Sequence, residues 1–189
     1  VTAGGGFTWD MRGMLCMLYA GHYVYRSLLF PLFLRTRRKR MPLVIALSAI
    51  FFNGVNASIN GYWLGTLSLQ EGHRFETGML FFAGLVLFIA GFFIHVWHDR
   101  KLISLRRNTS DGYTIPQGGL FRRISCPNFF GEMTEWCGFA LMCLSLPAFS
   151  FFCWTCANLM PRAWQHHKWY QRNFPDYPSG RKAVIPWIF

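Results

Sequence analysis

Several ionisable and amide side chains of this sequence lie inside or at the ends of strongly apolar segments. Burying such a group away from water is costly, and inside a membrane span it is a candidate for function by default. Three pairs have the i,i+4 spacing that puts both members on one helix face: His22 with Arg26, His95 with Asp99, and Asn128 with Glu132. A polar clamp between helices would explain each pair alone. Together the three pairs favour a shared polar cavity that reaches into the bilayer near Tyr23.

The basic tail contains a second candidate surface. Arg162, His166 and Tyr170 are spaced at i, i+4 and i+8, so they form one polar stripe along a predicted helix. The adjacent His166 and His167 point about 100° apart on a helix and cannot both face one metal ion. We therefore expect no metal site in the tail, and the sequence indicates none elsewhere in the chain.

The six cysteines do not suggest redox or metal chemistry. Cys153 and Cys156 have the spacing of a CxxC motif, but no second pair and no nearby histidine accompanies them. Their apolar surroundings favour free thiols that behave as small hydrophobic side chains. The sequence also lacks a P-loop, a nucleophile elbow, a Rossmann glycine motif and a zinc-binding cluster.

The amino-acid composition shows which class of protein can contain these residues. Of the 189 residues, 52% are hydrophobic and 14% are charged, and the net charge is +11. Soluble domains carry roughly 25% charged residues. This composition excludes a disordered, coiled-coil or collagen-like chain and makes a soluble globule a poor fit. Nucleic-acid binding would explain the cations but not the apolar mass, so we expect a membrane protein and no nucleic-acid partner.

The chain contains five apolar segments that we expect to cross a bilayer as helices. They run over residues 11–34, 43–64, 77–98, 129–146 and 148–159, and the last continues into the helical tail. The predicted fold is therefore all-α: a multi-pass helical membrane protein with residues 1–189 in one domain. The Gly-rich start, residues 1–10, has no signal-peptide pattern, and we expect the chain to be the C-terminal part of a longer protein.

The basic residues support this topology. With five spans, 16 of the 19 basic residues lie on one side and Arg74 alone lies on the other. Positively charged loops face the cytoplasm, so we expect the basic side there. The long loop 99–128 is on the same side and contains Gly118 and Gly119, which permit positive φ or close approach of a ligand.

The combination of motifs strongly resembles the steroid 5α-reductase family, from about His22 to Phe189. The motifs are His22-Tyr23-x-x-Arg26, Asp99 through Arg106, Tyr113-x-Ile-Pro-Gln-Gly-Gly-Leu-Phe, Asn128-x-x-Gly-Glu132-x-x-Glu135-Trp, Arg162-Ala-x-x-His166-His167-x-x-Tyr170 and Tyr177-Pro-x-x-Arg181. The resemblance implies an enzyme that uses NADPH to reduce the 4,5 double bond of 3-oxo-4-ene steroids taken from the lipid phase. It also implies seven spans, two of them before Val1.

The resemblance further implies a role for individual residues. Tyr23 matches the tyrosine that hydrogen-bonds the steroid 3-keto oxygen, and its glutamate partner in the family lies on a span before Val1. Arg26 is the second implied substrate-binding residue. His95 stands where the family commonly has Asn. The implied NADPH-binding residues are His95, Asp99, Arg106, Tyr113, Asn128, Glu132, Arg162, His166, Tyr170 and Arg181.

Other functions fit parts of the pattern. Enoyl-thioester and polyprenol reductases share the C-terminal motifs and NADPH. A membrane methyltransferase of the isoprenylcysteine type would bind S-adenosylmethionine instead. A sterol-binding scaffold without catalysis would need none of the polar pairs. The resemblance also leaves two locations open, the endoplasmic reticulum and a bacterial inner membrane.

Overall fold

The computed structural model describes residues 10–33, 42–73, 75, 78–108 and 114–189. Its α-helices and the shorter helical segments are α1 (Met11–Tyr23), a π-helical segment (Val24–Leu29), α2 (Phe30–Phe33), α3 (Leu43–Tyr62), a second π-helical segment (Trp63–Leu67), α4 (Ser68–Gln70), α5 (Met79–Asn108), a 3-10 turn (Gly119–Arg122), α6 (Pro127–Cys143) and α7 (Leu146–Asn173). No β-strand occurs among the described residues, where one isolated bridge joins Ile124 to Lys182. The predicted all-α class is confirmed.

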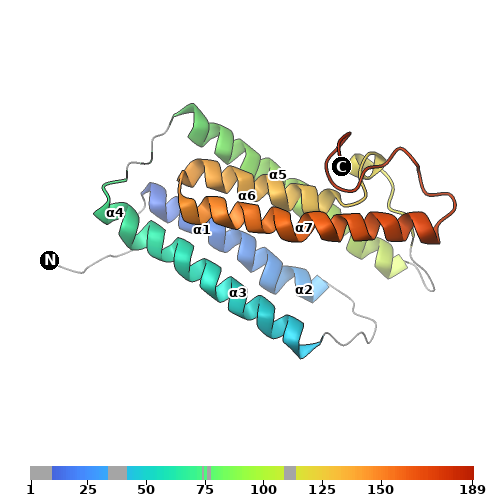
Figure 1. Cartoon of the computed structure of the whole chain (residues 1–189), viewed down its shortest axis with the longest axis horizontal. Coiled ribbons are helices and arrows are strands. Elements are labelled where there is room, and N and C mark those ends of the chain that lie inside the picture. The colour runs from blue at the N-terminus through green and yellow to red at the C-terminus, as the bar shows by residue number, and fades with distance from the viewer. Residues whose placement is uncertain (1–9, 34–41, 74, 76–77, 109–113) are drawn as a thin grey trace.

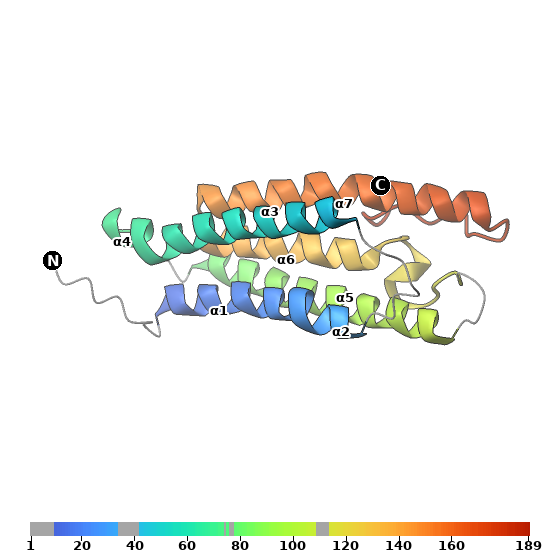
Figure 2. The same cartoon turned by 90° about the horizontal axis from the view of Figure 1, so that it is seen from below.

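The long helices run side by side along the length of the molecule (Figures 1 and 2). Seen from below, α1 and α5 lie on one side, α3 and α7 on the other, and α6 between them (Figure 2). The ends of α2, α5 and α7 and the C-terminal segment all lie at the same end of this bundle (Figure 1). We call this the basic end.

Glycines let α5 and α6 approach each other closely. A Cβ added at Gly84 would lie 2.7 Å from the carbonyl oxygen of Gly138, and one at Gly138 would overlap the backbone of Gly84 and Phe88. Gly91 and Gly131 have the same relation one step along the pair, where added Cβ atoms would meet the backbone of the facing helix. Small residues at a helix interface permit this approach in membrane proteins. The contact between Gly91 and Gly131 therefore brings the part of α5 that carries His95 close to the part of α6 that carries Glu135.

A tight connection joins α6 to α7. Leu144 has a left-handed backbone with φ 45°, and the Ser145 side chain caps α7 by accepting from the Ala148 amide at 3.4 Å. The helix α7 continues to Asn173, so the predicted helical tail is confirmed. In the loop before α6, Gly118 and Gly119 have φ of 81° and 57°, which confirms their predicted backbone freedom.

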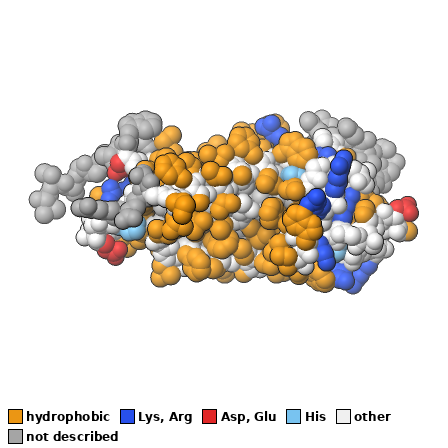
Figure 3. Space-filling model, turned by 90° about the horizontal axis from the view of Figure 1, so that it is seen from above, with side chains coloured by type: hydrophobic (Ala, Val, Ile, Leu, Met, Phe, Trp, Pro, Cys, Tyr) orange, Lys and Arg blue, Asp and Glu red, His pale blue; other side chains and the backbone are white. Residues whose placement is uncertain are grey.

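Two helices are long and apolar enough to cross a membrane, residues 43–70 and 79–106. Hydrophobic side chains cover the middle of the face shown in Figure 3, and Lys and Arg side chains gather toward the basic end. Both features agree with a membrane protein. The other three spans and the two expected before Val1 stay predictions.

Candidate functional site

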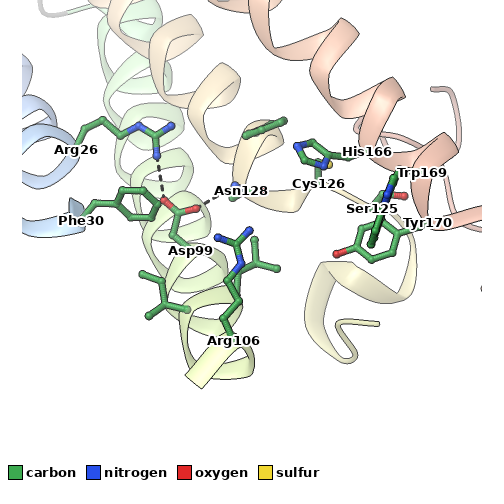
Figure 4. A pocket seen from close by; sticks show the side chains of 13 residues that line it. Arg26, Phe30, Asp99, Arg106, Ser125, Cys126, Asn128, His166, Trp169 and Tyr170 are labelled. Atoms are coloured by element: carbon green, nitrogen blue, oxygen red, sulfur yellow. Dashed lines mark hydrogen bonds and ion pairs between the residues drawn. The ribbon is translucent and has the colours of Figure 1, made fainter. Parts of the chain in front are cut away.

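A cavity of about 340 Å³ lies at the basic end, between α2, α5, α6 and α7. We call it the polar cavity. It is within the size range of small-molecule and cofactor sites. Its lining combines charged, amide and aromatic side chains, as Figure 4 shows. The lining residues are Arg26, Phe30, Asp99, Leu102, Ile103, Arg106, Ser125, Cys126, Asn128, Phe129, His166, Trp169 and Tyr170.

Asp99 is the centre of the polar contacts in this cavity. Its carboxylate accepts a hydrogen bond from the Asn128 amide at 3.0 Å and lies 3.5 Å from the Arg26 guanidinium. The His95 ring lies on its other side, with Nε2 3.0 Å from Oδ2. Asp99 is 2% exposed, so these contacts hold a buried charge between three helices. A carboxylate that accepts from both an amide and a guanidinium is fixed in orientation.

The second side of the polar cavity is electropositive. Burial and the nearby charges of Arg106 and Arg162 lower the pKa of His166 below its ordinary value. The imidazole is therefore neutral at neutral pH, beside a cation that is permanently charged. The Phe129 and His166 rings lie 6.1 Å apart and, with Tyr170, give this side an aromatic surface. Such a site suits an anionic ligand that also has flat rings.

The C-terminal segment is tied to the cavity wall at Ser125. The Ser125 hydroxyl lies 2.6 Å from His167 Nδ1 and 2.6 Å from the Tyr177 hydroxyl. It also donates to the Lys182 carbonyl at 3.0 Å. Burial lowers the pKa of His167, and Lys168 and Lys182 lower it further, so the ring is neutral. Its Nε2 accepts from the Gln171 side-chain amide at 2.9 Å, and its Nδ1 then donates to the Ser125 hydroxyl. This network holds the segment that carries Arg181.

Arg181 is a buried cation whose guanidinium is only partly bonded. It is 3% exposed, and its Nη2 donates to the Gln117 side-chain oxygen at 3.0 Å. Its Nε and Nη1 are buried and make no hydrogen bond with any described residue. Buried guanidinium nitrogens normally have partners. Two unsatisfied donors on a buried cation fit a ligand that supplies anionic oxygens.

A deeper polar layer lies behind the cavity. His22 Nδ1 is 2.8 Å from Glu135 Oε1, and His95 Nδ1 is 3.5 Å from Glu135 Oε2. The side chains of His22, His95 and Glu135 are 0–2% exposed. Through Asp99, this layer is continuous with the polar cavity.

Tyr23 lies away from the polar cavity, between α1 and α3. Its hydroxyl donates to Asn53 Oδ1 at 3.3 Å and accepts from Asn56 Nδ2 at 3.4 Å. Both are long for hydrogen bonds that involve a hydroxyl oxygen. Asn56 makes a shorter bond of 2.7 Å to the Tyr19 hydroxyl. The Tyr23 hydroxyl therefore has long contacts to α3, and it also interacts with the Tyr19 hydroxyl on its own helix.

The structure brings together many of the residues that the sequence singled out. Arg26, Asp99, Arg106, Asn128, His166 and Tyr170 line one cavity. Glu132 lies 3.9 Å from Arg26, beside the cavity. His95 does not line it but lies behind Asp99. Arg162 is exposed on α7, and its charge helps to lower the pKa of His166. Tyr113 lies outside the described residues.

Some lining residues were not anticipated from the sequence. Phe30, Ser125, Cys126 and Phe129 carry no motif that marks them, because ordinary apolar or small side chains become lining only through packing. Burial raises the pKa of Cys126 to about 12, so its thiol stays protonated. Trp169 also lines the cavity, although the sequence did not mark it as a site residue.

The fold and the cavity together define a class of protein. The described part of the chain is a bundle of helices, two of them apolar enough to span a membrane, with a cation-rich polar cavity at one end. The family model of 3-oxo-5-alpha-steroid 4-dehydrogenase matches residues 39–189. The chain belongs to this family of oxidoreductases.

Curated proteins with names from the same family are similar in sequence to most of this chain. The chain is 42% identical over 190 residues to steroid 5-alpha-reductase DET2 of Solanum lycopersicum, an alignment that covers 98% of this chain and 73% of the relative. It is 40% identical over 179 residues to the protein of the same name in Arabidopsis thaliana, covering 90% and 68%. It is 37% identical over 175 residues to 3-oxo-5-alpha-steroid 4-dehydrogenase 1 of Rattus norvegicus, covering 93% and 67%.

Proposed function

We propose that this protein reduces the 4,5 double bond of 3-oxo-4-ene steroids with NADPH, giving 5α-3-oxosteroids. Membership of the family and the names of the relatives support the reaction class. The observation that carries the proposal is the polar cavity. Five residues that the resemblance assigned to NADPH, distributed over α5, α6 and α7, converge on it: Asp99, Arg106, Asn128, His166 and Tyr170.

The residues present fit a dinucleotide. Arg106 lines the cavity and Arg181 has two unsatisfied buried nitrogens, and guanidinium groups bind phosphate oxygens well because they donate in a planar fork. Trp169 and Tyr170 supply ring faces for flat groups. Asp99 and Asn128 supply an acceptor and an amide for hydroxyl and carboxamide groups. These residues would bind and orient NADPH, which supplies the hydride.

Tyr23 is the proposed electrophilic donor. Addition of hydride to C5 of the enone moves negative charge onto the 3-oxygen, and the C4 carbon then takes a proton. A hydroxyl aimed at that oxygen in a dry site stabilises the developing charge, and the loss of one such donor costs about 10²–10³ in rate. The long bonds to Asn53 and Asn56 leave the Tyr23 hydroxyl able to exchange its acceptor for the steroid carbonyl.

The remaining assignments follow the charge and the apolar surface. We propose that the basic end faces the cytoplasm, where NADPH is available, in the endoplasmic reticulum of a eukaryote or the inner membrane of a bacterium. The steroid enters from the lipid phase, since the sides of the bundle are apolar. Arg26 is the proposed contact between the two sites, because it lies in the π-helical segment that directly follows Tyr23 and lines the polar cavity.

A substrate panel tests the proposal. Membranes that contain the protein are incubated with NADPH and, in separate reactions, progesterone, testosterone, an enoyl-CoA and a polyprenol. Chromatography with mass spectrometry then identifies the products. We expect the 5α-reduced steroids and no product from the other two substrates. Reduction of the enoyl-CoA or the polyprenol alone, or steroid reduction that does not require NADPH, would contradict the proposal.

A further inference from the structure

Three buried side chains from three helices form a compact cluster behind the polar cavity. His22 on α1, His95 on α5 and Glu135 on α6 each direct one ligand-type atom inward, and these atoms lie within 4.8 Å of one another. The cluster is made of two imidazoles and one carboxylate. That donor set binds divalent transition metals such as zinc in many proteins.

Polar atoms without hydrogen bonds are concentrated around this cluster. Among the described residues, the buried atoms without a hydrogen-bond partner include both ring nitrogens of His95, Oε2 of Glu135, Oε2 of Glu132 and the Tyr25 hydroxyl. His95 approaches Asp99 and Glu135 closely, but neither approach has the direction of a hydrogen bond. Buried polar groups are rarely left this way, and each one requires an explanation such as an ion or a water molecule.

The charges of the cluster also accommodate a divalent cation. Three carboxylates lie in or beside it, on Asp99, Glu132 and Glu135. Within the described ranges, the permanent cation that ion-pairs with them is Arg26. One doubly charged ion with two neutral imidazoles would bring the sum to zero, as would protonation of both imidazoles without an ion, and the metal analysis below separates the two cases. A buried excess of negative charge without such a partner is strongly unfavourable.

We propose that His22, His95 and Glu135 bind one divalent transition metal ion of the zinc class. The ligand atoms are Nδ1 of His22, Nδ1 of His95 and a carboxylate oxygen of Glu135, with a water molecule completing four-coordination. His22 Nδ1 lies 2.8 Å from Oε1 of Glu135 and His95 Nδ1 lies 3.5 Å from Oε2, and one ligand atom of each of the three residues lies within 4.8 Å of the other two. Metal–ligand bonds of about 2.0 Å in a tetrahedron put neighbouring ligand atoms roughly 3.3 Å apart, so small shifts of these side chains would complete the site.

The surroundings of His95 support this site. Asp99 Oδ2 lies 3.0 Å from Nε2, on the side of the ring opposite the proposed metal ligand Nδ1. A carboxylate that holds the far nitrogen of a ligating histidine fixes its orientation and tautomer in metal sites generally. The ion would join α1 to the pair α5–α6, and it would connect structurally to the polar cavity through Asp99. No sequence spacing indicated this site, because His22 and Glu135 are 113 positions apart.

Metal analysis of the purified protein tests the proposal. Protein without an affinity tag is treated with a chelator in detergent, dialysed, mixed with Zn²⁺ alone and freed of excess ion. Bound zinc is measured by mass spectrometry, and the midpoint of thermal unfolding is measured with and without the ion. We expect one zinc per chain and a higher unfolding temperature. A wild-type protein that retains no zinc would overturn the proposal.

Two variants and one control locate the ion. His95→Asn and Glu135→Gln keep polar side chains of similar size but remove a ligand atom, and each should weaken zinc binding by at least about tenfold. His98→Asn is the matched control, because His98 is also buried on α5 but bonds to the Ile94 carbonyl and lies outside the cluster. Equal zinc affinity in His95→Asn, Glu135→Gln and wild type would place the ion elsewhere and overturn the proposal.

A third measurement needs no variant and no substrate. X-ray absorption of the wild-type protein loaded with cobalt(II) should show two imidazole ligands and one carboxylate, whereas thiolate or purely oxygen coordination would overturn the site. None of these measurements uses NADPH or a steroid. A negative result for metal binding therefore leaves the proposed reductase function untouched, and a negative result for steroid reduction leaves the metal proposal untouched.

Discussion

At the scale of single residues, polar side chains occupy two layers with different contacts. The outer layer surrounds Asp99 and opens into the polar cavity, while the inner layer joins His22, His95 and Glu135. Tyr23 belongs to neither, since its hydroxyl faces Asn53 and Asn56 on α3. The proposed chemistry therefore depends on a tyrosine and a cofactor cavity held by different helix contacts, and each can be altered separately.

Tyr23→Phe removes the proposed donor and keeps the ring. We expect steroid turnover to fall by at least about 10², because one oxyanion donor is lost, while NADPH binding is kept. Turnover is normalised to the amount of protein that binds NADPH, and Tyr62→Phe, an exposed tyrosine on α3, is the control. If Tyr23 only ties α1 to α3, stability falls and the normalised turnover stays near the wild-type value, which would exclude it as the donor.

His166 gives a pH dependence to NADPH binding. Its pKa in the free protein is lowered by burial and by Arg106 and Arg162, so it is neutral at neutral pH. A bound phosphate favours the imidazolium, so binding takes up a proton and the affinity falls as pH rises through the pKa of His166 in the complex. Calorimetry across pH should show a flatter dependence for His166→Gln than for wild type.

The control for this measurement is His73→Gln, because His73 follows shortly after α4, which lies at the other end of the bundle (Figure 1). The phosphate of NADPH itself titrates near pH 6. That titration is common to all three proteins, so only the difference between them reports on His166. Identical pH profiles for wild type and His166→Gln would remove His166 from the phosphate-binding surface.

At the scale of elements, the glycine contact between α5 and α6 holds both polar layers in register. Gly138→Ala would place a methyl group against the backbone of Gly84 and Phe88. Overpacking of this kind costs about 1–3 kcal/mol, so we expect a lower unfolding temperature and weaker NADPH binding. Gly54→Ala on α3 has open space around its Cβ and should leave both unchanged or raise stability slightly. A Gly138→Ala protein as stable as wild type would show that the two helices can separate without cost.

The sequence predicted the helices better than the contacts between them. Apolar runs and the polar tail stripe were enough for five helical segments, but the helices extend beyond the apolar runs, as α5 does to Asn108. The pair His95–Asp99 was predictable because both are on one regular helix. The predicted pair of His22 and Arg26 does not share one set of contacts, because His22 bonds to Glu135 whereas Arg26 bonds to Asp99. The helix changes to π geometry at Val24, between these two residues. A change from α- to π-helical geometry leaves no local pattern in a sequence. Neither does a contact such as that of His22 with Glu135, which are 113 positions apart.

At the scale of the whole molecule, the apolar middle and the basic end predict how the bundle is oriented in a membrane. Ser179 is exposed at the basic end and Glu71 is exposed beyond α4, toward the other end (Figure 1). In a background without native cysteines, Ser179→Cys should react with an impermeant thiol reagent from the cytoplasmic side and Glu71→Cys from the opposite side. Reaction of both from one side would contradict the orientation and an odd number of spans.

The central claim is direct hydride transfer from NADPH to C5 of the steroid, and labelled cofactor tests it most directly. NADPH carrying deuterium at C4 of the nicotinamide, in each of its two stereochemical forms, is incubated with the protein and progesterone. Magnetic resonance of the product then locates the label. One of the two forms should give a 5α-steroid with deuterium at C5, and the other should give an unlabelled product. Deuterium at C4 of the steroid, or a reduced steroid without label from both forms, would contradict the account.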